Sequence, residues 1–398
     1  MTKTVSDAYI VAAHRSPVGK APRGVFRKTR PDDLLAHVLR GAVASASLDP
    51  ALIEDVIVGC AMPEAEQGMN VARIGLLLAG FPVTVPGVTV NRFCSAGLQA
   101  VAMAADRIRV GEADVVMAAG TESMSMVPMM GNKVVMNPAV FAGDSNVGIA
   151  YGMGITAEKV AAQWKVSRAE QDAFAAESHR RALAGREQGH FKAEILPFEV
   201  LAEGFDPSSR KLTRATRLVA DDEGPRADTT VEGLAALRPV FDAKGSVTAG
   251  NSSQMSDGAG AVLLASEAAV KRYNLKPLAR FVTFKVVGVA PEIMGIGPRD
   301  AIPKALKAAG LKQDDLDWIE LNEAFAAQSL AVIKDLGLDP KRVNPLGGAI
   351  AWGHPLGATG AIRTATCLHG LARTGGRYGV VTMCVGTGMG AAGIFERM

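Results

Sequence analysis

The sequence is poor in cysteine and in aromatic residues, and aromatic residues make up only 5% of the chain. Its four cysteines among 398 residues are Cys60, Cys94, Cys367 and Cys384, and none of them belongs to a CxxC pair. This spacing excludes the usual zinc sites and dithiol redox motifs. The cysteines are therefore expected to be free thiols, some of which could be chemically active.

An excess of one charge and long apolar runs are also absent. The 43 Lys and Arg residues nearly balance the 40 Asp and Glu residues, with a net charge of +3, so no global charge favours nucleic acid or a membrane as partner. No stretch reaches the roughly 18 charge-free apolar residues of a membrane span, and the N-terminal apolar run is too short for a signal peptide. We expect a cytoplasmic protein, with small or locally charged molecules as candidate ligands.

The sequence does contain an α/β pattern. Sheets covered by helices are expected, and the chain is longer than one core usually serves, so two or more domains are predicted. The composition changes over residues 122–248, which are rich in methionine at first and then in polar and charged residues. We predict an insertion here that is suited to ligand contacts, with a polar helix over 167–188 and a charged loop over 206–230. The main predicted strands are 55–59, 87–90, 114–120, 261–265, 315–321, 377–384 and 391–396, and the predicted helices include 98–109 and 325–336.

Two flanking segments resemble each other weakly. The stretches beginning "VNRFCSAG" and "VNPLGGAIAWGHPLGATG" both run from a Val-Asn strand end through a Gly/Ala turn and a helix to a strand that ends in glycine. An internal duplication is the economical explanation. Two unrelated β-α-β units are the alternative.

Cys94 lies where an apolar strand gives way to an amphipathic helix. The segment "PGVTV" is typical of a strand, and Leu98, Val101, Ala105 and Ile108 repeat at helical spacing. The free amides and positive end of such a helix would favour the thiolate by about 0.3 to 2 kcal/mol and so lower the pKa of Cys94. A thiolate there could attack a carbonyl. The alternative is a small apolar residue that fills a tight turn.

Cys384 lies just before a glycine-rich turn near the C-terminus. Gly388, Gly390 and Gly393 match a dinucleotide-binding pattern, but only five residues follow Gly393. That leaves no room for the phosphate-binding helix, so the dinucleotide interpretation fails. The glycines more plausibly let backbone amides approach a ligand atom beside Cys384.

Other polar candidates lie in the C-terminal third. His354 occupies a glycine-rich loop, "GGAIAWGHPLGATG", from which it could reach a site without obstruction, although a satisfied loop histidine is the more common case. Asn322 and Glu323 lie at a predicted strand-to-helix junction. Either could simply cap the helix.

Taken together, "NRFCSAGLQA", "GNSSQMSDGAG", "LNEAFA", "GGAIAWGHPLGATG" and "CVGTGMG" resemble the motifs of the thiolase family, in that family's order and over essentially the whole chain. The last turn looks closer to degradative 3-oxoacyl-CoA thiolases, since Thr387 departs from the Cys-x-Gly-Gly-Gly turn of biosynthetic acetoacetyl-CoA enzymes. The resemblance implies two duplicated βαβαβαββ halves in a five-layer αβαβα sandwich. It places residues 1–121 and 249–271 in the N-terminal half, 122–248 in a loop domain that covers the active site, and 272–398 in the C-terminal half.

The resemblance also implies a reaction and a role for each motif. The expected reaction is CoA-dependent cleavage of 3-oxoacyl-CoA to acetyl-CoA and a shortened acyl-CoA, with Cys94 as nucleophile and His354 as its proton acceptor. Cys384 would protonate the departing acetyl-CoA carbanion, which suits a thiol pKa near the working pH. One oxyanion hole would consist of His354 and a water held on Asn322, the other of the backbone amides of Cys94 and Gly386.

The expected ligand is coenzyme A, as a substrate, with no permanently bound cofactor and no metal. By resemblance, Arg226 contacts the nucleotide end of CoA and Ser253 contacts pantetheine, and the protein is a homodimer or a dimer of dimers. A basic run over residues 20–30 is expected to be a solvated face. The residues predicted to line the acyl and pantetheine tunnel are Met153, Met294, Ala324 and Phe325, and the alternative is that they are ordinary core residues. Further basic candidates for contacts with the phosphates of CoA are Arg210, Lys211, Arg214 and Arg217, and the alternative is a solvated surface.

Three other functions compete with a degradative thiolase. A biosynthetic thiolase would favour condensation over cleavage. A 3-oxoacyl synthase shares the fold but uses a different Cys and His pattern, which Cys384 and the "NEAF" stretch argue against. A non-catalytic CoA-binding or lipid-carrier protein should lack one reactive cysteine, whereas both are present.

Overall fold

The molecule is described by a computed structural model that covers residues 5–143, 147–206, 208 and 210–398. Its body contains two sets of strands, β4-β3-β5-β8-β1 and β10-β11-β12-β9, and the second set repeats the arrangement of the first without the outer strand β4. In each set a parallel pair (β3 with β5, β10 with β11) continues into antiparallel neighbours. This repetition confirms the duplication. The strands are β1 (Ala8–Arg15), β3 (Asp55–Gly59), β4 (Gly87–Val90), β5 (Val115–Ser123), β8 (Ser256–Ser266), β9 (Ala279–Gly288), β10 (Leu316–Leu321), β11 (Tyr378–Val385) and β12 (Met389–Arg397).

The two sets of strands are joined at one edge. Tyr9 of β1 pairs with Arg280 of β9, and Ile10 pairs with Ala279. With the short strand β2 (Gly19–Lys20), which pairs with β8, they form one ten-stranded sheet. The two halves therefore share a single curved sheet instead of two separate ones.

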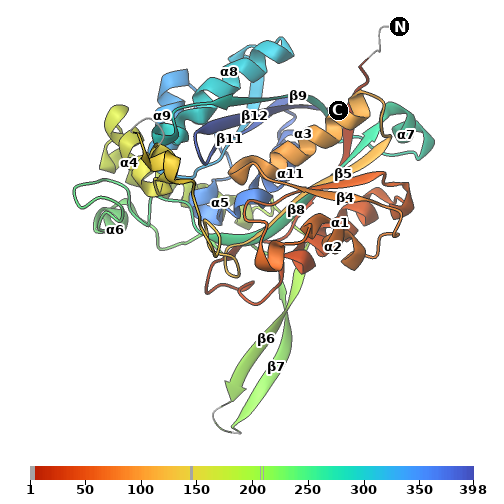
Figure 1. Cartoon of the computed structure of the whole chain (residues 1–398), viewed down its shortest axis with the longest axis horizontal. Coiled ribbons are helices and arrows are strands. Elements are labelled where there is room, and N and C mark those ends of the chain that lie inside the picture. Colours follow the sequence, from red (N-terminus) through yellow and green to blue (C-terminus); the bar gives the residue numbers. More distant parts are fainter. Residues whose placement is uncertain (1–4, 144–146, 207, 209) are drawn as a thin grey trace.

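Helices cover both sheet faces and fill the space between the halves (Figure 1). α3 and α11 pack on each other between the two sets of strands, α1 packs on β1, β5 and β8, and α8 packs on β9, β11 and β12. This is the five-layer order α, β, α, β, α. The helices of the body are α1 (Pro31–Ala46), α2 (Val71–Leu78), α3 (Ala96–Arg109), α7 (Glu267–Arg272), α8 (Gly297–Ala309), α9 (Ala326–Leu336), α10 (Ala349–Trp352) and α11 (Thr359–Thr374).

The central helices approach each other closely because small residues face the contact. Gly360, in the first turn of α11, lies so near α3 that a Cβ there would come within 2.1 Å of the backbone nitrogen of Leu98. Leu98, Val101, Ala105 and Ile108 are all buried, as their helical spacing predicts. The start of α3 is therefore held next to the start of α11, and both motif-bearing loops lie at this point.

The insertion contains helices α4 (Met153–Gln163), α5 (Arg168–Glu187) and α6 (Val231–Ala235), and strands β6 (Phe198–Asp206) and β7 (Lys211–Val219). Ser167 and Glu170 form a capping box at the start of α5, which explains why the polar run at 167–188 is helical. The predicted charged loop over 206–230 is wrong in part, because residues 211–219 pair with β6 in a hairpin that projects from the body (Figure 1). The sequence of residues 211–219 alone does not show that they pair with residues 198–206.

Strands 55–59 and 87–90 are confirmed residue for residue, and the predicted strand 114–120 is confirmed except that it begins at Val115 and extends to Ser123. In the part of the chain that the structure describes, no helix is both long and apolar enough to cross a membrane.

Candidate active site

Cys94 lies in a single 3₁₀ turn, η3 (Phe93–Ser95), between β4 and α3. The side chain of Asn91 holds this turn, since it accepts a hydrogen bond from the Phe93 amide (2.8 Å) and donates one to the Ala61 carbonyl (3.0 Å). Phe93 has φ 44°, a left-handed conformation that costs energy for a residue with a side chain. The turn holds Cys94 in the interior, where only 9% of the residue is exposed.

Two backbone amides, those of Gly386 and of Cys94 itself, point at the Cys94 sulfur and lower its pKa. Burial has the larger effect and raises the pKa of Cys94 to about 11. The expectation of a lowered thiol pKa is therefore wrong for the unliganded protein. The backbone amides at the start of the helix lower the Cys94 pKa, but removal of the sulfur from water raises it by more. The sequence pattern does not reveal this burial.

Cys384 is the second-last residue of β11, which contacts this turn. Burial and the neighbouring Cys94 both raise the pKa of Cys384 well above its usual range, so this thiol is not poised near neutral pH, contrary to expectation. The turn that follows is tight, because a Cβ at Gly388 (φ 93°) would lie 2.4 Å from the Val289 carbonyl oxygen. As expected, the glycines form a β-hairpin between β11 and β12 and no dinucleotide-binding helix.

His354 lies in the loop before α11 and belongs to the C-terminal half, whereas Cys94 belongs to the N-terminal half. Its Nδ1 lies 2.6 Å from Thr359 Oγ1, and its Nε2 lies 3.4 Å from Asn322 Nδ2. Because an amide nitrogen can only donate, Nε2 accepts this bond and Nδ1 carries the proton. Burial, with a smaller effect of Arg363, lowers the pKa of His354 to about 3. The imidazole is therefore a neutral base with its lone pair on Nε2.

The pH dependence of activity follows from this neutral histidine. A lowered His354 pKa means that the base stays unprotonated as the pH falls, so kcat/KM should remain level from about pH 8 down to about pH 5 and decline only on approach to the pKa of about 3. A kcat/KM profile with circular dichroism at each pH would separate titration from unfolding. An acid limb centred near the ordinary histidine pKa of about 6.5 would contradict the expectation.

The turns that carry these groups pack together. The η3 turn contacts both β11 and the 3₁₀ turn η8 (Leu356–Ala358), which follows His354. Asn322 Oδ1 is buried and has no hydrogen-bond partner among the described residues, so it is free to bind water or ligand. The helix-cap alternative for Asn322 and Glu323 is wrong, because the N-cap of α9 is Phe325. Glu323 instead accepts bonds from Ser178, Asn344 and Ile350.

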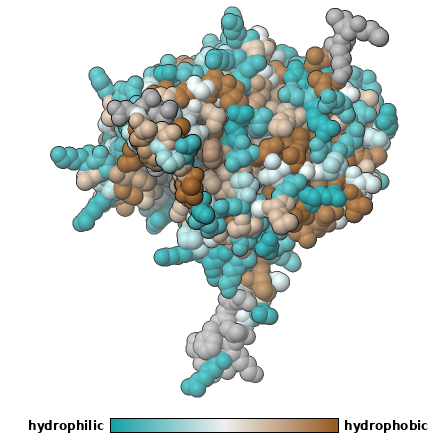
Figure 2. Space-filling view, in the orientation of Figure 1, coloured by the Kyte–Doolittle hydropathy of each residue, from teal (hydrophilic) through white to brown (hydrophobic). Residues whose placement is uncertain are grey.

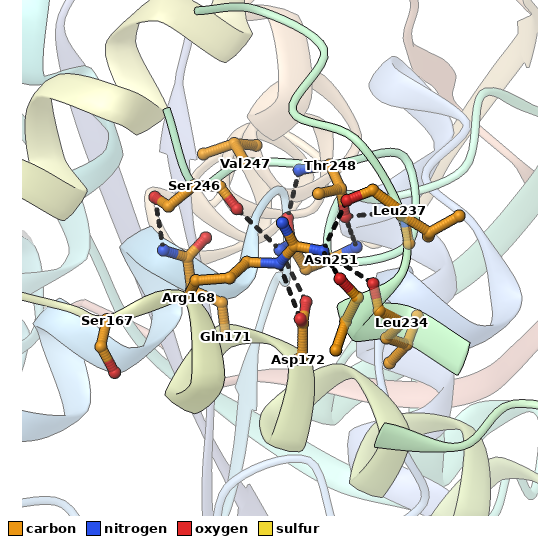
Figure 3. A network of polar contacts seen from close by, with 12 residues as sticks. Ser167, Arg168, Gln171, Asp172, Leu234, Leu237, Ser246, Val247, Thr248 and Asn251 are labelled. Carbon is orange, nitrogen blue, oxygen red and sulfur yellow. Dashed lines mark hydrogen bonds and ion pairs between the residues drawn. The ribbon is translucent and has the colours of Figure 1, made fainter. Parts of the chain in front are cut away.

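The "GNSSQMSDGAG" loop is anchored to the insertion by a network of polar contacts (Figure 3). Asn251 donates to Asp172 Oδ1 (3.0 Å) and to the Ser246 carbonyl (3.1 Å), and Asp172 also pairs with Arg168 (2.6 Å). Arg168 in turn donates to the Leu234 carbonyl (2.7 Å). The network fixes the segment that leads to Ser253, whose amide donates to the Ala324 carbonyl (2.9 Å).

Arg226 lies at a cavity of about 430 Å³ between the insertion and the body, which Lys20 and His179 also line. Its guanidinium is 58% exposed and pairs with Asp228, while its amide donates to His179 Nδ1 (3.2 Å). Burial lowers the pKa of His179 to about 4, so His179 is neutral and the cations at the cavity are Lys20 and Arg226. The basic run at 20–30 was expected to be a solvated face, but Lys20 contributes to this cavity.

The predicted tunnel residues surround Cys384. Met153, Met294, Ala324 and Phe325 belong to one apolar cluster with it, and Met294 is almost completely buried. The other basic candidates lie elsewhere. Lys211, Arg214 and Arg217 belong to β7 of the projecting hairpin and Arg210 to the turn before it, and Arg217 lines a separate cavity with Arg23, Arg27 and Arg40. The side chains of Arg210, Arg214 and Arg217 are exposed, which favours the solvated-surface alternative for these three.

Sequence reasoning missed three residues that hold the site. Thr359 Oγ1 contacts His354 Nδ1 and orients the ring, and the carbonyl of Gln254 accepts a bond from the His354 amide (3.1 Å). Glu122 binds the loop after His354. Thr359 and Gln254 lie inside the quoted motifs, but their polar partners come from other segments and leave no spacing signal.

Comparison with known proteins agrees with this geometry. The N-terminal domain of thiolase matches residues 8–268, and the C-terminal domain of thiolase matches residues 275–397. The 3-ketoacyl-CoA thiolase of Bacillus subtilis is 48% identical, over 98% of this chain and 100% of its own length. The peroxisomal 3-ketoacyl-CoA thiolase A of Rattus norvegicus is also 48% identical, over 99% of this chain and 89% of its own length.

Solved structures are similar throughout. Human mitochondrial 3-ketoacyl-CoA thiolase superposes with a TM-score of 0.89 and 39% identity over 99% of each chain. The dimeric peroxisomal thiolase of Saccharomyces cerevisiae gives a TM-score of 0.87 and 42% identity over 99% of this chain and 98% of its own. The chain therefore belongs to the thiolase family.

Proposed function

We propose that this chain catalyses the CoA-dependent thiolytic cleavage of 3-oxoacyl-CoA to acetyl-CoA and a shortened acyl-CoA. The observation that carries the proposal is that two thiols from different halves, Cys94 and Cys384, lie close enough for Cys94 to raise the pKa of Cys384. The backbone amides of Cys94 and Gly386 are directed at the Cys94 sulfur. The two relatives named 3-ketoacyl-CoA thiolase, which are 48% identical over almost the whole chain, support the same reaction.

In the first half-reaction the Cys94 sulfur attacks the 3-oxo carbon while His354 Nε2 takes its proton. Both groups are neutral at rest, so charge develops only as the S–C bond forms. The bond between C2 and C3 then breaks, the acyl group remains on Cys94 as a thioester, and the carbanion takes a proton from Cys384. A thiol whose pKa is raised holds its proton until a strongly basic carbanion appears, which suits a donor.

In the second half-reaction CoA attacks the acyl group on Cys94. The proton of the CoA thiol goes to the Cys384 thiolate, and Cys94 recovers its own proton from His354 as it leaves. The resting state is restored, and the cycle is of the ping-pong type.

Negative charge on oxygen develops in both half-reactions. The amides of Cys94 and Gly386 are directed at the reacting sulfur, so an oxygen on the carbon bound to it would lie within their reach. The protonated Nε2 of His354 and a water on Asn322 Oδ1 would stabilise the enolate oxygen of the departing acetyl-CoA. One such donor typically contributes about 3 to 4 kcal/mol to transition-state stability.

The cavity at Arg226 is a suitable place for the nucleotide end of CoA. It carries two cations, Lys20 and Arg226, against one carboxylate, Asp228, and phosphate is well bound by such groups. Ser253 precedes Gln254, which lines this cavity, and its amide donates to Ala324 of the cluster around Cys384, so the pantetheine arm is expected to pass beside it. Coenzyme A acts here as a substrate, and the mechanism uses no permanently bound cofactor.

The experiment that tests the function is a set of kcat/KM values for 3-oxoacyl-CoA substrates of about C4 to C10 with free CoA. Thiolysis of acetoacetyl-CoA and of at least one longer substrate is expected. Cleavage of acetoacetyl-CoA alone would favour the acetoacetyl-CoA enzyme. Tight CoA binding without turnover would identify a carrier protein.

We also propose that the protein is a homodimer formed through the edge of its N-terminal half. Strand β4 ends the sheet, and apolar side chains gather around it and α2 (Figure 2). Met69 is 93% exposed and Val83 is 77% exposed, and Leu78 and Val88 are also exposed. An exposed strand edge with an apolar border is a typical pairing surface. The dimeric yeast relative supports this assembly.

Replacing Val88 by arginine is expected to convert the dimer to monomer, because a charge would be buried in the paired edge. Light scattering during size-exclusion chromatography would give the mass. Val5→Arg is a matched control, since Val5 is also an exposed apolar residue but lies in the segment before β1. A V88R protein that keeps the dimer mass at micromolar concentration would place the interface elsewhere.

The four cysteines are all buried and unpaired, which supports a reducing compartment such as the cytoplasm as the place of action.

A further inference from the structure

Glu122, at the end of β5, is a buried carboxylate that the proposed reaction does not use. It is fully buried, and in the part of the chain that the structure describes it has no cationic partner within ion-pair distance. Its stronger hydrogen bonds come from the amides of Ala61 (2.7 Å), Met62 (3.2 Å) and Gly357 (2.9 Å) and from Gln67 Nε2 (2.7 Å), and the Cys60 thiol adds a longer contact to Oε1 (3.9 Å). Burial raises the pKa of Glu122, and the four stronger donors oppose that effect.

One oxygen of this carboxylate joins the two halves of the site. Oε2 accepts bonds from both Ala61 and Gly357. On one side, Ala61 is tied through its carbonyl to Asn91, which holds the Cys94 turn. On the other side, Gly357 lies three residues after His354 and two before Thr359, the partner of His354 Nδ1. The path from Glu122 to each reacting group is therefore short.

The backbone around this oxygen leaves almost no free space. A Cβ at Gly357 would lie 2.6 Å from the Ala61 nitrogen and 2.8 Å from Glu122 Oε2. Cβ atoms at Gly97 and Gly120 would lie 2.8 and 2.6 Å from the Gly357 carbonyl oxygen. The turn after His354 is thus enclosed by the N-terminal half on both sides, and a shift of this turn would move His354 relative to Cys94.

Gln67 holds the carboxylate in one orientation. Its amide nitrogen donates to the Met62 carbonyl (2.8 Å) as well as to Glu122 Oε1, and its carbonyl oxygen accepts from the Ser123 amide. Rotating the Gln67 amide would break all of these bonds. A glutamine at position 122 would therefore turn a nitrogen donor toward another donor in either orientation.

We propose that Glu122 is a positioning residue, which fixes the His354 loop against the Cys94 turn by binding the amides of Ala61 and Gly357 with one oxygen. The proposal rests on the proposed function in assigning the His354 and Cys94 pair as the groups that are aligned. Glu122 itself neither forms nor breaks a bond in the reaction.

The test is Glu122→Gln, measured by two readouts that should move in opposite directions. Thiolysis should fall by about 100-fold in kcat with little change in KM for CoA, because a displacement of about 1 Å between reacting groups costs that much. Alkylation of Cys94 by iodoacetamide at fixed pH should become faster, because the charge of Glu122 raises the Cys94 pKa and would be lost. A loosened fold would also speed alkylation at other buried thiols such as Cys367, which should not change when only the Glu122 charge is lost.

Asp257→Asn is the matched control. Asp257 is also a buried carboxylate and accepts bonds from Ser123 and Ser125, but it has no bond to the C-terminal half among the described residues. It should lose thermal stability while kcat stays within about threefold of wild type. If Glu122→Gln does not fold, Gln67→Ala tests the same link, with a smaller kcat loss expected.

Wild-type-like kcat in folded Glu122→Gln, or alkylation that slows in step with thiolysis, would overturn the proposal. Failure of the proposed function would look different. The wild type would then not cleave 3-oxoacyl-CoA at all, whereas the alkylation comparison would still report on Glu122.

Discussion

Cys94→Ala is expected to lower the kcat of thiolysis by about 10,000-fold or more, the scale of losing a nucleophile that works as a unit with its base. Alanine offers no atom that can hold the acyl group, and neither His354 nor Cys384 can replace it. The fold should persist, because the site is small and buried and alanine fits without strain. Turnover of acetoacetyl-CoA with CoA would give the rate.

Cys367→Ala is the matched control for this variant. Cys367 is another buried free thiol, in α11 and outside the site, so its loss should leave kcat close to wild type. If Cys94→Ala retained about a tenth of wild-type activity, the nucleophile would have to be another group.

Cys384→Ala should separate the two chemical steps. Without Cys384, His354 can still carry the proton between the Cys94 thiol and the CoA thiol, and both amides remain in place, so exchange of labelled CoA into acetyl-CoA should continue. Claisen condensation and thiolysis should fall by about 1,000-fold or more, because no other thiol reaches the carbanion position to carry the proton. Removing the Cys384 thiol takes away neither of the two amides that face the Cys94 sulfur.

The labelled-CoA exchange and the condensation assay must be run on the same preparation. Condensation at the wild-type rate would refute the assigned role of Cys384. Loss of exchange together with condensation would instead show that Cys384 supports the Cys94 turn structurally.

Much of the fold could be predicted from local patterns. β3 and β4 were bounded correctly because each is a short apolar run between turn residues, and α3 was visible through the spacing of Leu98 to Ile108. β9 and the helix α8 were not identified, since β9 alternates only partly and α8 contains Pro303. The joining of β1 to β9 depends on edge pairing between distant segments, which no local pattern encodes.

The sequence nominated the residues of the candidate site, whose roles stay predictions, but it did not reveal their protonation states. Cys94, His354, Cys384 and Asn322 were found because each lies in a motif with a distinctive composition. Their pKa values were mispredicted or not predicted, because desolvation arises only when the two halves close over them. Helix position alone suggested a thiolate at Cys94, whereas the folded environment favours neutral groups that exchange a proton during the reaction.

The most direct test of this account is tandem mass spectrometry of the protein quenched during turnover with 3-oxohexanoyl-CoA. The account predicts a butyryl thioester on the peptide that contains Cys94, and none on the peptide that contains Cys384. A butyryl group on Cys384, or rapid turnover without any acylated cysteine in a rapid-quench time course, would contradict it.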